Sequence, residues 1–321
     1  MDLVLRHATL KSMEHKFKDR EVPEKIIPAV VKFYDIAGLV KGASQGEGLG
    51  NQFLSHIREV DAVMHLVRDF TDENILRSGS TNPRDDISVI NTELILADIQ
   101  TITKRFEKAE FDIRKSRSKE NLERYGTLNK VKGCLDRGEL ANAIDLSKEE
   151  KEYIKDLNLL TLKPMIYVYN ISEDSMNNIS THDIQEHFSD ALFLCAKVEA
   201  DLGSFDEKER LEYMRELGLA ESGLDRVIKK CYETLGLETY FTAGPKEVHA
   251  WTFEKGLKAP QAAGIIHTDF ERGFISAEIL PFSKLTEAGS WRNAKDKGLV
   301  RVEGKEYTVE DGDVVEFRFS V

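Results

Sequence analysis

A glycine-rich segment directly after an apolar strand constrains the fold of this chain more than any other feature. The apolar run 29–34 predicts a buried strand, and Asp35 and Gly38 follow it as D-x-x-G. In such a motif the Asp reaches Mg²⁺ through water, and the glycine N–H meets the γ-phosphate of a nucleotide. Five glycines lie from Gly38 to Gly50, which suits a segment that changes backbone conformation between nucleotide states. The alternative is a merely flexible surface loop.

Short apolar runs separated by helical patterns predict a doubly wound α/β sheet. The runs are 29–34, 61–67, 165–169 and 191–195. A first strand would sit at the centre of such a sheet, and the run 3–5 is a candidate for that place, although no glycine turn follows it.

A long helical stretch lies between the second and third of these runs. Apolar residues recur there at spacings of three and four, which predicts a heptad seam. The seam residues are Ile95, Ile99, Ile102, Phe106, Ala109 and Ile113, answered by Leu128, Val131 and Leu135. A polar turn near 116–120 separates the two sets, so we expect an antiparallel coiled-coil hairpin. Ser147 and Glu150 have capping-box spacing and predict a helix start.

The end of this hairpin is basic, whereas the whole chain carries a net charge of −12. Residues 103–119 hold seven basic and three acidic side chains, a local charge of +4. A solvated helical face is one explanation, and contact with RNA or a ribosomal surface is the other. The candidate contact residues are Lys108, Arg114, Lys115, Arg117 and Lys119.

The pattern changes to short strands and turns after about residue 235. The segment 247–253 predicts a strand, Asp311-Gly312 predicts a turn, and 315–321 alternates apolar and polar residues as a half-buried strand does.

Several motifs together resemble the Obg-like ATPase family, also called YchF, from about residue 26 to the end of the chain. They are the glycine-rich segment 35–54, Asn170-Ile171-Ser172-Glu173, Cys195-Ala196-Lys197-Val198-Glu199, and the C-terminal runs 240–244, 259–264, 267–270 and 311–314. The resemblance implies a P-loop NTPase G-domain-like sheet, N-terminally incomplete, with a helical coiled-coil insertion and a C-terminal β-grasp (TGS) domain. The expected boundaries are 1–90 with 156–235 for the G domain, 91–155 for the insertion and 236–321 for the TGS domain.

The resemblance also implies a purine site. Guanine-specific G domains carry N-K-x-D, and here the corresponding residues are Asn170 and Glu173, without the Lys and with a longer carboxylate. Losing a guanine hydrogen-bond pair relaxes base specificity, so ATP is expected to be accepted and GTP is a second nucleotide. Cys195, Ala196 and Lys197 resemble the family's backbone contact to the base. Asn170 could equally cap the next helix.

Two groups expected of a nucleotide hydrolase are missing from this sequence. No G-x-x-x-x-G-K-[ST] occurs, and Leu39 stands where many G domains have a water-orienting Gln. A nearby loop His is proposed to compensate in the family, but the loop 71–80 has none and Arg77 lies near that place. We therefore keep two functions open: a ribosome-associated ATPase or GTPase that uses Mg²⁺, held by Asp35, and a non-enzymatic module that binds the ribosome, RNA or a protein.

Composition supports a soluble chain of 321 residues, at 41% hydrophobic and 32% charged. The three cysteines are widely spaced, so no disulfide framework or zinc site is expected. No apolar run approaches the ~18 residues that span a bilayer, and no charged-then-apolar leader begins the chain. We expect a cytoplasmic protein with ribosome or ribosomal RNA as partner, and neither membrane nor DNA.

Overall fold

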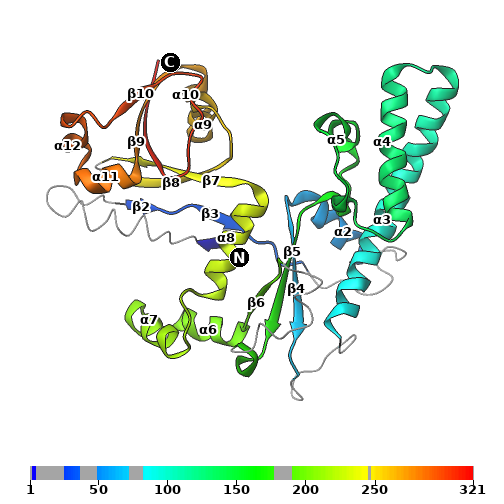
Figure 1. Cartoon of the computed structure of the whole chain (residues 1–321), viewed down its shortest axis with the longest axis horizontal. Helices are drawn as coiled ribbons and strands as arrows, with labels where there is room; N and C mark the ends of the chain where they lie inside the picture. The colour runs from blue at the N-terminus through cyan, green and yellow to red at the C-terminus, as the bar shows by residue number, and fades with distance from the viewer. Residues whose placement is uncertain are drawn as a thin grey trace. The chain divides into compact units, whose positions relative to one another are not determined.

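The computed structural model describes residues 2–4, 25–36, 49–71, 82–176, 190–244 and 247–320. They belong to two compact units, the central unit of residues 36–227 and the terminal unit of residues 1–35 with 228–321. Each unit has its own sheet and its own hydrophobic core (Figure 1).

The central unit is built on a parallel sheet with the strand order β4-β5-β6. Its strands are β4 (Val63–Asp69), β5 (Met165–Ile171) and β6 (Leu192–Leu194). These strands confirm three of the four predicted apolar runs. Its other large elements are α2 (Leu49–Glu59), α3 (Pro83–Lys115), α4 (Lys119–Asp136), α6 (Ala196–Ser204), α7 (Glu207–Glu216) and the start of α8 (Gly223–Leu235).

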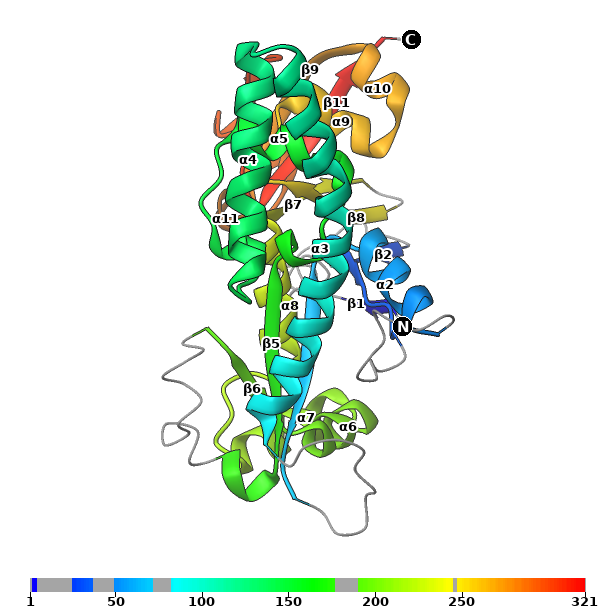
Figure 2. The same ribbon diagram turned by 90° about the vertical axis from the view of Figure 1, so that its right-hand side faces the viewer.

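The first half of α3 packs on the sheet, and its second half leaves it to form a hairpin with α4 (Figure 2). Asn82 caps the start of α3 by accepting from the N–H of Arg84, and Pro83 occupies the first turn. Ser118 caps α4 in the same way, accepting from Asn121. The turn between the helices thus falls where the sequence predicts it.

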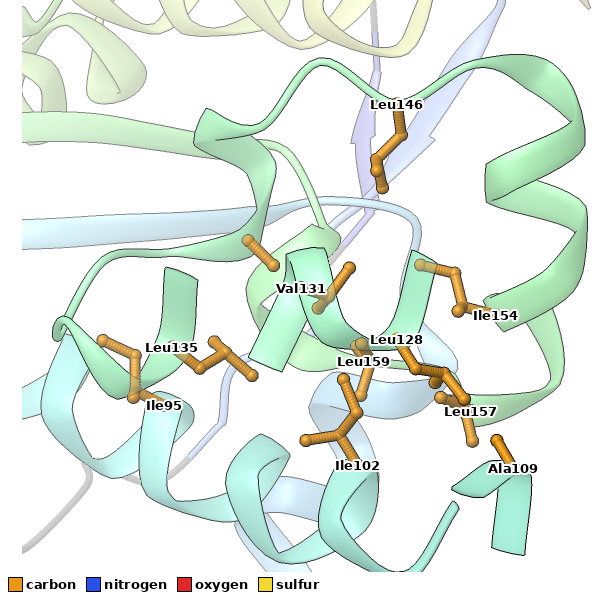
Figure 3. Packing of buried hydrophobic residues seen from close by; sticks show 11 residues of the cluster. Ile95, Ile102, Ala109, Leu128, Val131, Leu135, Leu146, Ile154, Leu157 and Leu159 are labelled. Atoms are coloured by element: carbon orange, nitrogen blue, oxygen red, sulfur yellow. The ribbon is translucent and has the colours of Figure 1, made fainter. Parts of the chain in front are cut away.

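The predicted heptad seam is the core of this hairpin. Ile102, Leu128 and Val131 are fully buried, and the cluster extends to residues that follow α4 (Figure 3). Those residues come from η1 (Ala141–Ala143), α5 (Lys148–Ile154), η2 (Lys155–Leu157) and the connecting segments that hold Leu146 and Leu159. The capping box of Ser147 and Glu150 at the start of α5 is present, with both reciprocal hydrogen bonds.

A buried carboxylate holds the hairpin to the chain that returns to the sheet. Asp98, in the middle of α3, accepts from the backbone N–H groups of Leu160 and Thr161 at 2.9 and 2.7 Å, and from the Thr161 hydroxyl at 2.6 Å. Leu160 and Thr161 belong to η3 (Leu160–Leu162), whose open N-terminal N–H groups need acceptors. Burial raises the pKa of Asp98.

The terminal unit is a mixed sheet with the strand order β10-β9-β11-β7-β8-β2. Its strands are β2 (Lys25–Ile27), β7 (Leu237–Ala243), β8 (Glu247–Glu254), β9 (Phe274–Pro281), β10 (Arg301–Glu303) and β11 (Asp313–Phe319). Its helices are α9 (Ala259–Ile266), α10 (Thr268–Arg272), α11 (Phe282–Ala288) and α12 (Trp291–Asp296). Gly312 has φ of +83°, as the predicted turn requires.

The sequence mis-assigned the pairing of the first apolar run. The strand β3 (Val30–Lys32) is partly exposed, and it pairs antiparallel with β1 (Asp2–Val4) rather than with β4-β5-β6 in the described chain. Leu3 and Val4 of the run 3–5 thus lie beside it. The strand β2, expected in the G domain, instead pairs with β8 in parallel. Pairing is a long-range property that an apolar run does not encode. The three predicted domain boundaries stay a prediction.

Candidate functional site

Two segments of the predicted purine site meet at the carboxyl ends of neighbouring strands. Asn170, near the end of β5, lies opposite Leu194 of β6 in the parallel register. Its Oδ1 accepts from the backbone N–H of Ala196, the first residue of α6, at 2.9 Å. Carboxyl ends of parallel strands followed by helix N-termini are the usual ligand edge of a doubly wound sheet.

Asn170 therefore caps a helix, but not the one that follows it in sequence. After β5 the local turn is closed by Ser172, whose Oγ accepts from the N–H of Ser175. The N-cap residue of α6 is Cys195, whose side chain makes no capping bond, so Asn170 supplies the missing acceptor from the adjacent strand. The Ala196 N–H that the sequence assigns to the base is thus bonded to Asn170. The Nδ2 of Asn170 has no acceptor within the described residues.

A second polar link joins the same two segments. The Nζ of Lys197 lies 3.3 Å from Oε2 of Glu173, and the two side chains are 76% and 42% exposed. The hydrogen bond to Glu173 raises the pKa of Lys197. Glu173, which replaces the guanine-reading Asp, is therefore paired with a cation in this structure.

Sequence reasoning missed the residues that hold α6 in place. The carboxylate of Glu199 accepts from the N–H groups of Gly223 and Leu224 at 2.7 and 3.1 Å, so α6 is tied to the start of α8. A Cβ at Gly223 would lie 2.7 Å from both Glu199 Oε1 and Leu194 Cβ, so no larger residue fits there without a shift. Glu199 and Gly223 are 24 residues apart, so no local sequence pattern indicates their contact.

Apolar packing around Cys195 supports the contact between Asn170 and Ala196. Cys195 is 4% exposed and packs with Val198, Leu202 and Met214, with Met176 of the β5 side against them. This cluster fixes the N-terminus of α6 relative to the chain after β5, so the position of Asn170 against Ala196 is set by the core.

The phosphate side of the predicted site is only partly described. Asp35 is exposed and follows β3 in the terminal unit. Gly38, Leu39 and Arg77 lie outside the described residues. Among the residues described, no group of three or more His, Cys, Asp or Glu side chains is placed to hold a metal ion.

The basic end of the hairpin is at the surface. Arg114 and Lys119 are 72% and 90% exposed, and they form ion pairs one turn away with Glu110 at 2.9 Å and with Glu123 at 3.7 Å. Lys108, Lys115 and Arg117 are also exposed. Over the described part of the chain, none of the helices is both long and apolar enough to cross a membrane.

Comparison with known proteins identifies relatives along most of the chain. It is 47% identical over 308 residues to the ribosome-binding ATPase YchF of Bacillus subtilis, covering 93% of this chain and 84% of the relative. It is 48% identical over 305 residues to the protein of the same name from Escherichia coli O157:H7, with the same coverage. A sequence model described as 50S ribosome-binding GTPase matches residues 5–94. One for the YchF GTPase C-terminal region, described as a protein of unknown function (DUF933), matches residues 237–320.

Solved structures agree with these sequence matches. The YchF GTPase of Schizosaccharomyces pombe superposes with a TM-score of 0.85 at 34% identity, covering 99% of this chain and 86% of that one. A GTP-binding protein from Pyrococcus horikoshii, at 17% identity and a TM-score of 0.52, shares the fold alone. The expected α/β G-domain-like fold with its C-terminal domain is confirmed by these matches, and the chain belongs to the YchF, or Obg-like ATPase, family.

Proposed function

We propose that this protein is a ribosome-associated ATPase that binds its purine base at the ends of β5 and β6. The observation that supports this most is the agreement between the relatives, named ribosome-binding ATPases at 47 and 48% identity, and the Asn170–Ala196 contact at a ligand edge of the sheet. The non-enzymatic binding module is the weaker alternative, because the relatives match over 93% of the chain rather than over the hairpin alone.

The pairing of Glu173 supports a preference for adenine. Guanine presents two N–H donors that a free carboxylate would accept, and the carboxylate of Glu173 is instead 3.3 Å from Lys197. Adenine lacks this pair of donors, and its ring nitrogens can accept from the Nδ2 of Asn170. ATP is therefore the proposed nucleotide, with GTP as a weaker ligand. The proposed base contacts are Asn170, Glu173, Cys195, Ala196 and Lys197.

Asp35 is the proposed protein ligand of Mg²⁺. Mg²⁺ in nucleotide sites keeps several waters, so the exposed carboxylate of Asp35, which follows β3, fits a role in which it holds the ion through water. Gly38 is the proposed γ-phosphate contact. When bound, the ion neutralises charge on the phosphates. We assign no catalytic residue, because the side chain of Leu39 can neither donate to nor accept from water.

The proposed ribosome contact is the basic end of the hairpin, formed by Lys108, Arg114, Lys115, Arg117 and Lys119. Its exposed cations face outward on a rigid two-helix support, while the whole chain is acidic at −12. A local cluster of cations on an acidic protein directs a polyanion to one surface. A ribosomal partner places the protein in the cytoplasm.

Co-sedimentation with purified ribosomes tests the proposed ribosome contact. The variant with Arg114, Lys115 and Arg117 each changed to Gln should lose most of its binding and show a smaller salt dependence. A control variant with Lys151, Lys297 and Lys305 each changed to Gln carries the same charge change elsewhere on exposed surfaces. Equal binding by the two variants would remove the hairpin from the proposal, and no binding by the unaltered protein would contradict the ribosomal function itself.

A further inference from the structure

One line of side chains on α3 combines cations with an aromatic ring. Lys104, Lys108, Phe111 and Lys115 are spaced by four, three and four residues, so they lie along one face of the helix over about 16 Å. All four are exposed. The Nζ of Lys115 lies 4.3 Å from the centre of the Phe111 ring. We call these four residues the α3 stripe.

The fold does not use the α3 stripe. The seam that packs against α4 runs through Ile102, Phe106 and Ala109, and each stripe residue is two positions from a seam residue, about 200° around the helix. Phe106 faces inward and packs on Tyr125 with ring centres 5.0 Å apart, whereas Phe111 is 55% exposed. The hairpin therefore buries one phenylalanine and presents the other on its outer face.

The stripe also carries no acidic side chain of its own. Across the described residues, no carboxylate forms an ion pair with Lys104, Lys108 or Lys115. The nearest acidic residues on the helix, Glu107 and Asp112, each lie about 70° around it from the line of the stripe. Three free cations on one face of an acidic chain form a local site for a polyanion.

We propose that the α3 stripe binds single-stranded RNA, with phosphates at the three lysines and an unstacked base on Phe111. This rests on the proposed ribosomal function and names the RNA feature that the hairpin contacts. Bases in a duplex are stacked and their faces are closed to an aromatic side chain, whereas loop and bulge bases can stack on one. Every base has a π-face, so the contact tolerates different sequences and depends on salt. The Nζ of Lys115 lies over one face of the ring, so the base would stack on the other face and Lys115 could pair with a phosphate beside it.

Fluorescence anisotropy with a labelled 12-nucleotide oligouridine, and with a 12-base-pair RNA duplex for comparison, tests the stacking contact. Phe111→Leu keeps an apolar side chain on the helix surface and removes only the aromatic ring. We expect it to weaken single-strand binding about tenfold, within the range of one lost base stack, with an unchanged salt slope. Phe111→Trp should restore binding. Leu122→Ala, at an equally exposed apolar position on α4 (49%), is the control and should bind as the unaltered protein does.

The same assay at several salt concentrations tests the lysines. Changing Lys104, Lys108 and Lys115 to Gln should reduce the slope of log affinity against log salt by about 2, because each phosphate contact to a single strand adds about 0.7. The control variant at Lys151, Lys297 and Lys305 has the same charge and should keep the slope.

Four results would overturn the proposal for the α3 stripe, and a fifth would contradict the proposed function. Phe111→Leu that binds as tightly as the unaltered protein excludes the stacked base, and equal slopes for the two lysine variants exclude the phosphates. Loss of ribosome co-sedimentation in the stripe variants without any RNA binding by the unaltered protein assigns the stripe to a ribosomal protein. If the unaltered protein does not sediment with ribosomes at all, the proposed ribosomal function is contradicted. If the unaltered protein sediments and both stripe variants sediment as it does, only the α3 stripe is excluded.

Discussion

Acidification should destabilise the central unit through His65. This residue lies on β4, is 7% exposed, and its Nδ1 has no hydrogen-bond partner in the described structure. Its nearest aromatic neighbour is Tyr167, with ring centres 5.9 Å apart. Burial lowers the pKa of His65 from 6.5 to about 4, partly opposed by the charge of Asp86. The native state therefore holds His65 neutral at pH values where the unfolded chain protonates it.

The sign and size of this pH effect on stability follow from the linkage between proton binding and folding. Since the folded pKa is depressed, the contribution of His65 to stability is fully present above pH 6.5 and is lost as the pH falls toward 4. Between pH 7.5 and pH 5.0 the loss is about 2 kcal/mol, and it approaches about 3 kcal/mol below pH 4. Asp98, whose pKa is raised by burial, shifts stability in the opposite direction.

Urea unfolding followed by far-ultraviolet circular dichroism at several pH values measures this effect. His65→Leu should remove about 2 kcal/mol of the difference between pH 7.5 and pH 5.0, and the contribution of Asp98 cancels because both proteins contain it. His56→Gln, on the exposed side of α2, is the matched control and should keep the full pH dependence. If His65→Leu and the unaltered protein show the same pH profile, the reasoning about burial is refuted.

Three further predictions follow from packing and pairing in the central unit. Leu128→Ala, at a fully buried seam position, should lower the free energy of unfolding by about 2–5 kcal/mol, and a loss below 1 kcal/mol in urea unfolding would contradict the seam as the hairpin core. Gly223→Ala should cost about 1–3 kcal/mol because its Cβ meets Leu194 and Glu199, whereas Gly203→Ala, with open space around it, should be neutral or stabilising in the same assay. Lys197→Met frees Glu173 and should raise the affinity for GTP relative to ATP by up to about fivefold, the value of an exposed ion pair; an unchanged ratio in a competition assay would contradict the role given to that pair.

Features with a local period could be predicted from the sequence. The seam through Ile102 and Leu128 was predicted because a heptad pattern forces those side chains onto one face, and β4, β5 and β6 were predicted because buried strands are continuous apolar runs. The partner of β3 could not be predicted, because its register with β1 depends on which chain segment meets it and not on its own residues.

The candidate site likewise contains residues that could be predicted from the sequence and contacts that could not. Asn170 and Ala196 were found because they resemble family motifs, but the hydrogen bond between them spans 26 residues and required the structure. The same holds for Glu173 with Lys197, whereas Gly223, the partner of Glu199, was not found from the sequence at all. The α3 stripe is present in the sequence as spaced residues, and it became meaningful only when the packing of Phe106 showed which face of α3 points outward.

A titration of the full chain with a fluorescent ATP analogue and Mg²⁺, with ATP and GTP as competitors, tests the central claim most directly. Asn170→Ala removes the side chain that lies 2.9 Å from the Ala196 nitrogen, and Asn129→Ala, on the exposed face of α4, is its control. We expect binding that ATP displaces more readily than GTP, that Asn170→Ala weakens and that Asn129→Ala leaves unchanged. Binding that does not respond to Asn170→Ala, or no binding at millimolar nucleotide, would contradict a base site at the ends of β5 and β6.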